Sequence, residues 1–469
     1  MKNKSITKYL CAIALTFCLG SSLCSCSNGE ISGGGLPNDD FTAAVDDGAD
    51  SELYKRYTTY KKDMEEAFLS TPAAPTESFV LEQVEGGVKI VDYVSDAKVV
   101  RIPGQLLDGR SVVGIAENVF ADKNMRAIYV PDSVTEMDRG ALAGCNGLLT
   151  LRLPEIFGGY LGYVFGADEY GENATTVPAS LDRLILGGSV TSIPDNAFSG
   201  CKTLSGVRIV GEIDEIGEFA FYGCSDLVCV DINKVTKISE YAFGECASLY
   251  EMDCSSSSDV ELGAFYGCVS LNKITLSNIG DEDSGYLGYV FGAETAEYSA
   301  RYVPSSLRTV AISGPCQQIG ARSFAECKYI TKVILGEGVQ SIDVRAFYRC
   351  RSLSDMVIPD TLVSIGDDAF FGCDNLVSVT FGKNTASIGM QAFMGCKSLK
   401  EITMPDGVTE IKASTFYGCS ALEKIDLKNV KKIGKDAFGG CDSLVPIPLD
   451  GVDVADGNEA LVAVVAKKK

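Results

Sequence analysis

Hydrophobic positions recur along most of the chain at intervals of 22 or 23 residues. In the unit that ends at Cys419, Ile402 and Met404 alternate with polar residues, which predicts a short β-strand. Pro405 marks the end of that strand, because proline has no N–H to donate to a β-ladder. Phe416 supplies the large apolar side chain of the return segment. A unit this short cannot bury its own apolar residues, so the periodicity predicts a solenoid whose coils cover one another.

A loosely kept Ala-Phe-x-Gly-Cys motif is the most regular part of each unit. It ends at eleven cysteines: Cys145, Cys201, Cys224, Cys246, Cys268, Cys327, Cys350, Cys373, Cys396, Cys419 and Cys441. The intervals before Cys201 and Cys327 are longer, at 56 and 59 residues, and each contains one further strand pattern. We therefore predict a mainly β solenoid of about 14 stacked coils with short irregular return segments, which occupies residues 121–449.

The two long intervals share the sequence Tyr-Leu-Gly-Tyr-Val-Phe-Gly-Ala at an offset of 126 residues. Tyr160, Tyr163, Tyr286 and Tyr289 could form an aromatic docking surface. Alternatively, the repeated segment replaces the usual phenylalanine plug in a longer coil, and we favour this structural interpretation. The chain thus contains a duplicated larger unit.

The recurring signals resemble those of the BspA-like leucine-rich repeat family of bacterial surface proteins. They are the Ile-Pro pair at Ile358, the Val-Thr-x-Ile pattern ending at Ile193 and the Ala-Phe-x-Gly-Cys motif ending at Cys201. The resemblance covers about residues 79–449 and implies a leucine-rich-repeat solenoid. It also implies that residues 79–120 form an N-terminal capping coil, and that the protein adheres to host proteins, extracellular-matrix components or other cells.

The N-terminus is typical of an exported lipoprotein. Three lysines precede an apolar run that is too short to span a bilayer, so residues 1–25 are predicted to be a signal peptide. Leu23 and Ser25 stand at the −3 and −1 positions of a sequence that resembles a bacterial lipobox, which makes Cys26 the predicted lipidation site. A simple secretion signal cut nearby is the alternative. Residues 26–50 are predicted to be a flexible tether.

Apolar side chains at steps of three and four predict an amphipathic helix over residues 51–69, followed by a linker to residue 78. We favour a stalk or cap helix that covers an apolar edge over a helix that binds a partner. At the other end, residues 450–469 are predicted to form a C-terminal cap and tail.

The chain has 18 cysteines and no histidine or tryptophan among its 469 residues. The absence of histidine excludes Ser-His-Asp and Cys-His nucleophilic sites and imidazole zinc sites. No Cys-x-x-Cys occurs, so we expect no metal site, and the eleven motif cysteines are predicted to be free thiols in the core; disulfides are the alternative. Cys229 falls on the other face of its strand and is predicted to be exposed.

Net charge is −22, which argues against a nucleic-acid partner. The outward strand positions show no aromatic stripe, no single-sign band and no repeated carboxylate pair. These positions are Arg152, Ile185, Arg208, Asp231, Asp253, Thr275, Ala311, Ile334, Val357, Thr380, Thr403 and Asp426.

We therefore predict a non-enzymatic lipoprotein without cofactor or catalytic residues, anchored at the bacterial cell surface or outer membrane and binding a protein ligand. The ligand would be a host matrix protein or another cell. A surface glycan-binding accessory protein or enzyme, and a structural envelope component without a soluble ligand, are the alternatives.

Overall fold

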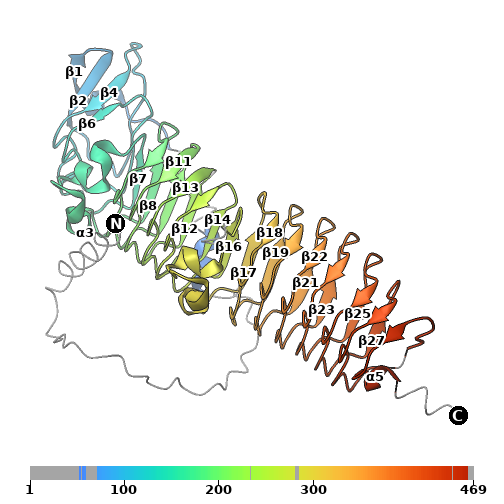
Figure 1. Cartoon of the computed structure of the whole chain (residues 1–469). Coiled ribbons are helices and arrows are strands. Elements are labelled where there is room, and N and C mark those ends of the chain that lie inside the picture. The colour runs from blue at the N-terminus through green and yellow to red at the C-terminus, as the bar shows by residue number, and fades with distance from the viewer. Residues whose placement is uncertain are drawn as a thin grey trace, which may run out of the picture. The chain divides into compact units, whose positions relative to one another are not determined.

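The computed structural model describes residues 52–53, 55–59, 71–232, 234–279, 285–445 and 447–462. This part of the chain forms a mainly β solenoid of about 16 turns, which confirms the predicted fold class. Figure 1 shows the coils following one another in chain order from the β1 end to α5 (Glu459–Val462).

Each coil begins with a strand of three or four residues, and these strands lie parallel and in register in what we call the long-strand face. One six-stranded sheet contains β3 (Val99–Arg101), β5 (Ala127–Tyr129), β7 (Thr150–Leu153), β8 (Arg183–Leu186), β10 (Gly206–Ile209) and β12 (Cys229–Ile232). A second contains β14 (Glu251–Cys254), β16 (Lys273–Leu276), β17 (Thr309–Ile312), β19 (Lys332–Leu335), β21 (Asp355–Val357) and β23 (Ser378–Thr380). β25 (Glu401–Thr403) pairs with β27 (Lys424–Asp426).

A shorter strand on the return leg of most coils builds a second, short-strand face. Its sheets contain β4 (Val112–Ile115) and β6 (Glu136–Met137); β9 (Ser192–Ile193), β11 (Ile213–Ile216), β13 (Val235–Ile238) and β15 (Asp259–Val260); β18 (Gln318–Ile319), β20 (Ser341–Ile342), β22 (Ser364–Ile365) and β24 (Ser387–Ile388); and β26 (Glu410–Ile411), β28 (Lys432–Ile433) and β29 (Asp453–Val454). The second residue of each two-residue strand is apolar and points into the core, so alternation of only two residues is enough to orient it.

Stacked phenylalanine rings run through the core between the two faces. The rings of Phe347, Phe370 and Phe393 lie 5.0 and 5.1 Å apart between centroids and are nearly parallel. The same stacking continues from Phe198 to Phe265 and from Phe324 to Phe438. Each ring is thus covered by its neighbours in the adjacent coils, as the repeat requires.

Both ends of the stack are covered. At the N-terminal end, η1 (Thr76–Ser78) leads into β1 (Phe79–Val84), which pairs antiparallel with β2 (Gly87–Tyr93), and β2 pairs with β4. The Tyr93 ring is buried against Phe79 and Phe120. At the C-terminal end, Leu461 of α5 is buried.

The duplicated segments form short helices in place of the phenylalanine motif. The first copy contains η2 (Phe157–Gly159), η3 (Leu161–Phe165), η4 (Tyr170–Glu172) and α3 (Asn173–Thr176), and the second contains η5 (Leu287–Phe291), η6 (Ala296–Tyr298) and α4 (Ser299–Tyr302). Each copy is stabilised by one buried polar side chain: Asn173 accepts a hydrogen bond from the Gly162 N–H, and Ser299 accepts one from the Gly288 N–H.

Candidate functional site

The C-terminal half of the long-strand face presents a continuous row of uncharged outward side chains, which we call the uncharged stripe. Its members are Thr275, Ala311, Ile334, Val357, Thr380 and Thr403. Ile334 is 43% exposed and Val357 is 66% exposed, although both are β-branched aliphatic residues. Exposed apolar side chains gathered in one place are typical of protein-binding surfaces.

Charged and polar side chains border this stripe on one side. The residues that begin the same strands include Lys332, Asp355 and Glu401, all of them exposed. A row of charged and polar side chains beside an uncharged row is the arrangement of a binding surface with a less polar centre and a polar rim. The sequence already contains the uncharged stripe, because six successive outward strand positions carry no charge. The sequence alone does not show that these side chains are exposed to solvent.

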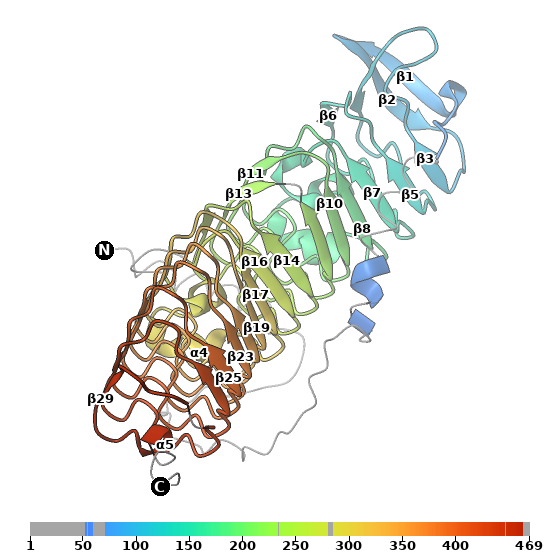
Figure 2. The same cartoon turned by 90° about the vertical axis from the view of Figure 1, so that its right-hand side faces the viewer.

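The long-strand face differs nearer the N-terminus, where an earlier part of the chain covers it. Residues 52–53 and 55–59 are helical, as predicted for that part of residues 51–69; the remaining positions of the predicted helix lie outside the described residues. The ring of Tyr57 lies 5.9 Å from the ring of Tyr250, the residue before β14. Figure 2 shows the short helical segment, in blue, beside the strands of the long-strand face. Burial and the neighbouring Glu251 carboxylate raise the pKa of Tyr57 above its ordinary value.

The prediction that Cys229 is exposed is wrong. Cys229 is the first residue of β12, but its side chain is only 3% exposed. The thiol lies close enough to Tyr57 to help raise the pKa of the tyrosine, so the helical segment passes near Cys229. Contacts between residues this distant in sequence cannot be read from strand alternation.

A second covered patch lies on the strands before β10. Ala127, Tyr129 and Ile185 form a small buried apolar cluster on the outward side of the sheet. Nearby, the Ala74 N–H donates to the Arg101 carbonyl, so the segment that precedes η1 crosses this face. Ile185 was predicted to be outward-facing, and it is, but the face is not open to solvent at this point.

All eleven motif cysteines are buried and free in the structure. In nine of them the thiol donates to the carbonyl of the phenylalanine one coil earlier; in Cys373, for example, Sγ lies 3.2 Å from the Phe347 oxygen. No such bond is present for Cys201 and Cys327, each of which follows one of the duplicated segments.

Burial makes these thiols poor nucleophiles. It raises the pKa of Cys145 to about 11 and the pKa of Cys201 and Cys441 to about 12. A thiol reacts as its thiolate, so the ladder has no group that is active near neutral pH. Within the described ranges, no cluster of acidic or cysteine side chains could hold a metal ion.

The duplicated tyrosines lie in matching pairs. The rings of Tyr160 and Tyr163 are perpendicular, with centroids 6.0 Å apart, and Tyr286 and Tyr289 repeat this geometry. The Tyr160 and Tyr286 hydroxyls donate to the carbonyls seven residues further on. Two of the four predicted binding residues are therefore engaged inside their own loops, while Tyr163 and Tyr289 are half-buried.

Cys26, the predicted lipidation site, lies outside the described residues, as do residues 1–50. No helix in the part of the chain that the structure describes is long and apolar enough to cross a membrane.

Comparison with known families matches the repeats to the BspA type leucine rich repeat region. Six copies match, over residues 109–166, 171–282, 298–385 and 340–451. No curated protein matches the chain.

Solved structures with a similar solenoid come from several bacteria. A leucine rich cell surface protein from Faecalibacterium prausnitzii A2-165 is 21% identical, with 85% of this chain and 99% of that chain covered and a TM-score of 0.24. A leucine-rich repeat protein from Bacteroides ovatus ATCC 8483 is 20% identical, with 81% and 98% covered and a TM-score of 0.28. An internalin from Listeria monocytogenes is 12% identical, with 71% and 89% covered and a TM-score of 0.34. At these identities the likeness concerns the fold alone.

Proposed function

Because the chain belongs to the BspA-type leucine-rich repeat family, whose members are bacterial surface proteins, we propose that it is a non-enzymatic surface lipoprotein that binds a protein ligand. The ligand is a host matrix protein or a protein on another cell, and the uncharged stripe makes the contact. The chain is held at the bacterial surface through a lipid on Cys26.

The exposure of Val357 is the observation that carries this proposal. A valine that is 66% exposed, in a row with Ile334 and four other uncharged residues, has no role in the core of the solenoid. Six adjacent coils place the row along consecutive strands, so the ligand would meet an extended flat surface rather than a cavity. Such a surface suits a folded protein better than a small molecule.

The covered N-terminal half of the same face supports the assignment to the stripe. Tyr57 covers the strands around β12 and β14, and the segment before η1 crosses the strands around β3 and β5. The strands from β16 to β25 carry the open part of the face, and their outward positions form the uncharged stripe.

A charged substitution in the uncharged stripe tests whether this surface binds the ligand. Val357→Lys puts an ammonium group in the centre of the surface, and we expect binding of the full chain to immobilised matrix proteins or to host cells to weaken at least tenfold, because the charge must be desolvated on contact. Val269→Lys is the matched control, since Val269 is 63% exposed but lies outside the stripe. Equal binding by both variants would contradict the proposed face, and glycan turnover by the wild-type chain would contradict the proposed function.

A further inference from the structure

An aromatic surface lies on the side of the coils that carries the Ala-Phe-x-Gly-Cys motif. It consists of side chains from three successive coils and from α4: Phe219, Tyr222, Tyr241, Tyr266 and Tyr302. We propose that this aromatic surface is a docking site for an arginine- or lysine-rich segment of a partner protein. The site is separate from the uncharged stripe and does not depend on what the stripe binds.

The rings form one continuous surface because neighbouring coils bring them into contact. The Phe219 and Tyr241 rings are stacked, with centroids 5.4 Å apart and an interplanar angle of 5°. Tyr222 packs edge-on against Phe219 at 5.5 Å. Tyr266 packs in the same way against Tyr241 at 5.9 Å. The rings therefore extend across three coils without interruption.

The part of the aromatic surface nearest α4 is open to solvent. Tyr266 is 38% exposed and Tyr302 is 42% exposed. Both rings border Gly292, where an added β-carbon would lie 3.1 Å from Tyr266 and 3.8 Å from Tyr302. Their hydroxyls have no hydrogen-bond partner among the described residues. Exposed aromatic side chains with free polar tips are typical of protein-binding surfaces.

Two of the rings stand at a backbone position that does not favour aromatic residues. Phe219 has φ +56° and Tyr241 has φ +54°, in the left-handed region that bulky residues rarely adopt. Glycine, asparagine and aspartate enter this region at lower cost. The equivalent residues of other coils are glycine or polar: Asn118, Gly140, Asn196, Gly263, Arg322, Arg345, Asp368, Gln391, Ser414 and Asp436. Neither Phe219 nor Tyr241 belongs to the buried core, which points to a role at the surface.

Carboxylates surround the rings and give the surface a negative charge. Burial raises the pKa of the Tyr241 hydroxyl, and the nearby Glu240 and Glu294 carboxylates raise it further. Burial and Glu245 raise the pKa of Tyr222 in the same way. None of these three carboxylates forms an ion pair with another described residue. A cation of a partner would thus meet negative charges that the chain does not neutralise.

The carboxylates also repel one another. Burial, Glu218 and Glu261 raise the pKa of Glu240, although Lys237 lowers it. That lysine is already engaged, since its Nζ lies 2.9 Å from Glu215 and 3.2 Å from Glu261. An incoming cation would relieve the repulsion, whereas an anionic ligand would add to it.

Aromatic rings bordered by carboxylates suit a cation, because the face of a ring is electrostatically negative and attracts an ammonium or guanidinium group. The chain itself makes such a contact next to Tyr302: the Arg301 guanidinium lies over the Tyr298 ring, 4.9 Å from its centroid. A neutral glycan would also stack on these rings, but it would leave the carboxylates uncompensated. Charge complementarity therefore favours a basic segment of a protein.

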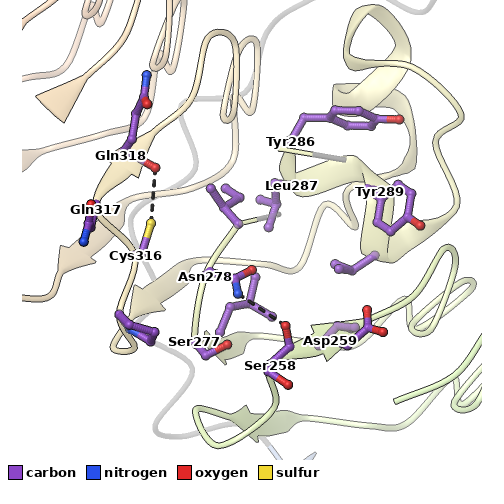
Figure 3. Close-up of a pocket in the computed structure, with 15 residues that line it drawn as sticks. Ser258, Asp259, Ser277, Asn278, Tyr286, Leu287, Tyr289, Cys316, Gln317 and Gln318 are labelled. Atoms are coloured by element: carbon purple, nitrogen blue, oxygen red, sulfur yellow. Dashed lines mark hydrogen bonds between the residues drawn. The ribbon is translucent and has the colours of Figure 1, made fainter. Parts of the chain in front are cut away.

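The second duplicated segment contributes to two different features. Figure 3 shows its Tyr286 and Tyr289 at a pocket that Asp259 and Gln318 also line. The aromatic surface takes Tyr302 from the same segment. The two tyrosines that the sequence predicted as docking residues in this segment are therefore not members of the aromatic surface.

The probe is a labelled synthetic peptide, Arg-Ser-Arg-Ser-Arg-Ser-Arg, whose alternation places every arginine on one side of an extended chain. Its binding to the purified full chain is measured by fluorescence polarisation at about 0.15 M salt, which screens long-range attraction to a protein of net charge −22. The control peptide replaces each arginine by citrulline, which keeps the planar group but removes its charge. We expect saturable binding of the first peptide and at least tenfold weaker binding of the second.

The double variant Phe219→Asn, Tyr241→Asn removes two rings and leaves the net charge unchanged. Asn196, at φ +60°, shows that asparagine accepts this backbone position. We expect peptide binding at least fivefold weaker and an unchanged circular dichroism spectrum. The matched control, Phe371→Asn, Tyr417→Asn, also removes one phenylalanine and one tyrosine from the motif side, but outside the aromatic surface. It should bind the peptide as the wild type does.

Glu245→Gln removes one carboxylate from the border of the surface. Glu401→Gln is its matched control, because it makes the same change of net charge at an exposed residue of the long-strand face. We expect the first variant to bind the arginine peptide at least threefold more weakly and the second to bind it normally. This pair separates local recognition from attraction to net charge, and it tests the site even if the double asparagine variant does not fold.

Equal binding of the two peptides, equal effects within either pair of variants, or absence of peptide binding would each overturn the inference. Binding of neutral oligosaccharides that the double asparagine variant loses would assign the surface to a glycan and would also overturn it. Val357→Lys, which tests the uncharged stripe, should leave the affinity for the arginine peptide within twofold, so failure of one site is distinguishable from failure of the other.

Discussion

At the scale of single residues, neighbouring positions of one repeat differ greatly in how much they contribute to the stability of the fold. Phe416 is fully buried, with the rings of Phe393 and Phe438 stacked on its two faces at 5.6 and 5.4 Å. The next residue, Tyr417, is 42% exposed. Adjacent aromatic residues therefore serve the core and the surface.

We expect Phe416→Ala to lower the free energy of unfolding by about 3–5 kcal/mol, because it leaves a cavity between two stacked rings. Tyr417→Ala should change the unfolding free energy by less than about 1 kcal/mol, since its side chain is largely solvated. Urea unfolding followed by circular dichroism compares the two variants. Similar losses in both would show that the ring ladder is not the main source of stability.

Special backbone conformations were also partly foreseeable at this scale. Gly395 has φ +75° at the Gly of the Ala-Phe-x-Gly-Cys motif, a region that glycine adopts without strain. Arg349 occupies the same motif position at φ +55°. The motif thus marks the turn even where the residue is not glycine.

At the scale of the coil, the cysteines act as a connected ladder. A thiol of one coil donates to the phenylalanine carbonyl of the coil before it, so each bond joins two neighbours. Burial raises the pKa of Cys373 and Cys396 well above the ordinary value. These thiols stay neutral in the folded chain, whereas they ionise above pH ~8.5 once unfolded.

The stability of the protein should therefore fall with rising pH in alkaline solution. The folded pKa is raised, so above pH ~8.5 the unfolded chain binds fewer protons than the folded one, and the loss continues until the folded pKa is reached. Below that pH the contribution is fully present. The expected slope is about −1.4 kcal/mol per pH unit for each thiol.

Urea midpoints at about pH 7.5 and about pH 9.5 measure this dependence. The double variant Cys373→Ala, Cys396→Ala serves as the comparison, because it removes two of the raised groups and should show a shallower decline. Parallel pH profiles would mean that these thiols are not neutral and buried. Disulfides between coils would also give parallel pH profiles. They would in addition leave few free thiols to react with a thiol reagent after denaturation without reductant.

At the scale of the whole molecule, the repeats form the scaffold, and the N-terminal segment determines which part of the long-strand face is open to solvent. The N-terminal segment reaches the long-strand face at Tyr57 and the first coils at Ala74. The strands that remain open carry the uncharged stripe. The proposed lipid on Cys26 would hold the scaffold at the cell envelope, since a chain of net charge −22 is repelled by anionic headgroups.

We expect Cys26→Ala to abolish labelling of the protein by radioactive palmitate in the producing bacterium and to leave the precursor uncleaved. Cys24→Ala, two residues earlier, should be labelled normally, because the lipobox pattern places the acylated cysteine at Cys26. Labelled Cys26→Ala protein would contradict the assignment.

The periodicity of the sequence by itself determined the solenoid, its coil count to within about two turns, and the burial of the phenylalanines and motif cysteines. This was possible because every coil meets the same neighbours, so local alternation already specifies which side chains point inward.

Only the tertiary structure decided which outward positions are covered. Cys229 and Ile185 are buried on parts of the long-strand face that the N-terminal segment reaches, while Val357, which holds the same strand position as Ile185, is open. Strand alternation gives the direction of a side chain, but contacts between distant segments determine whether that direction leads to solvent.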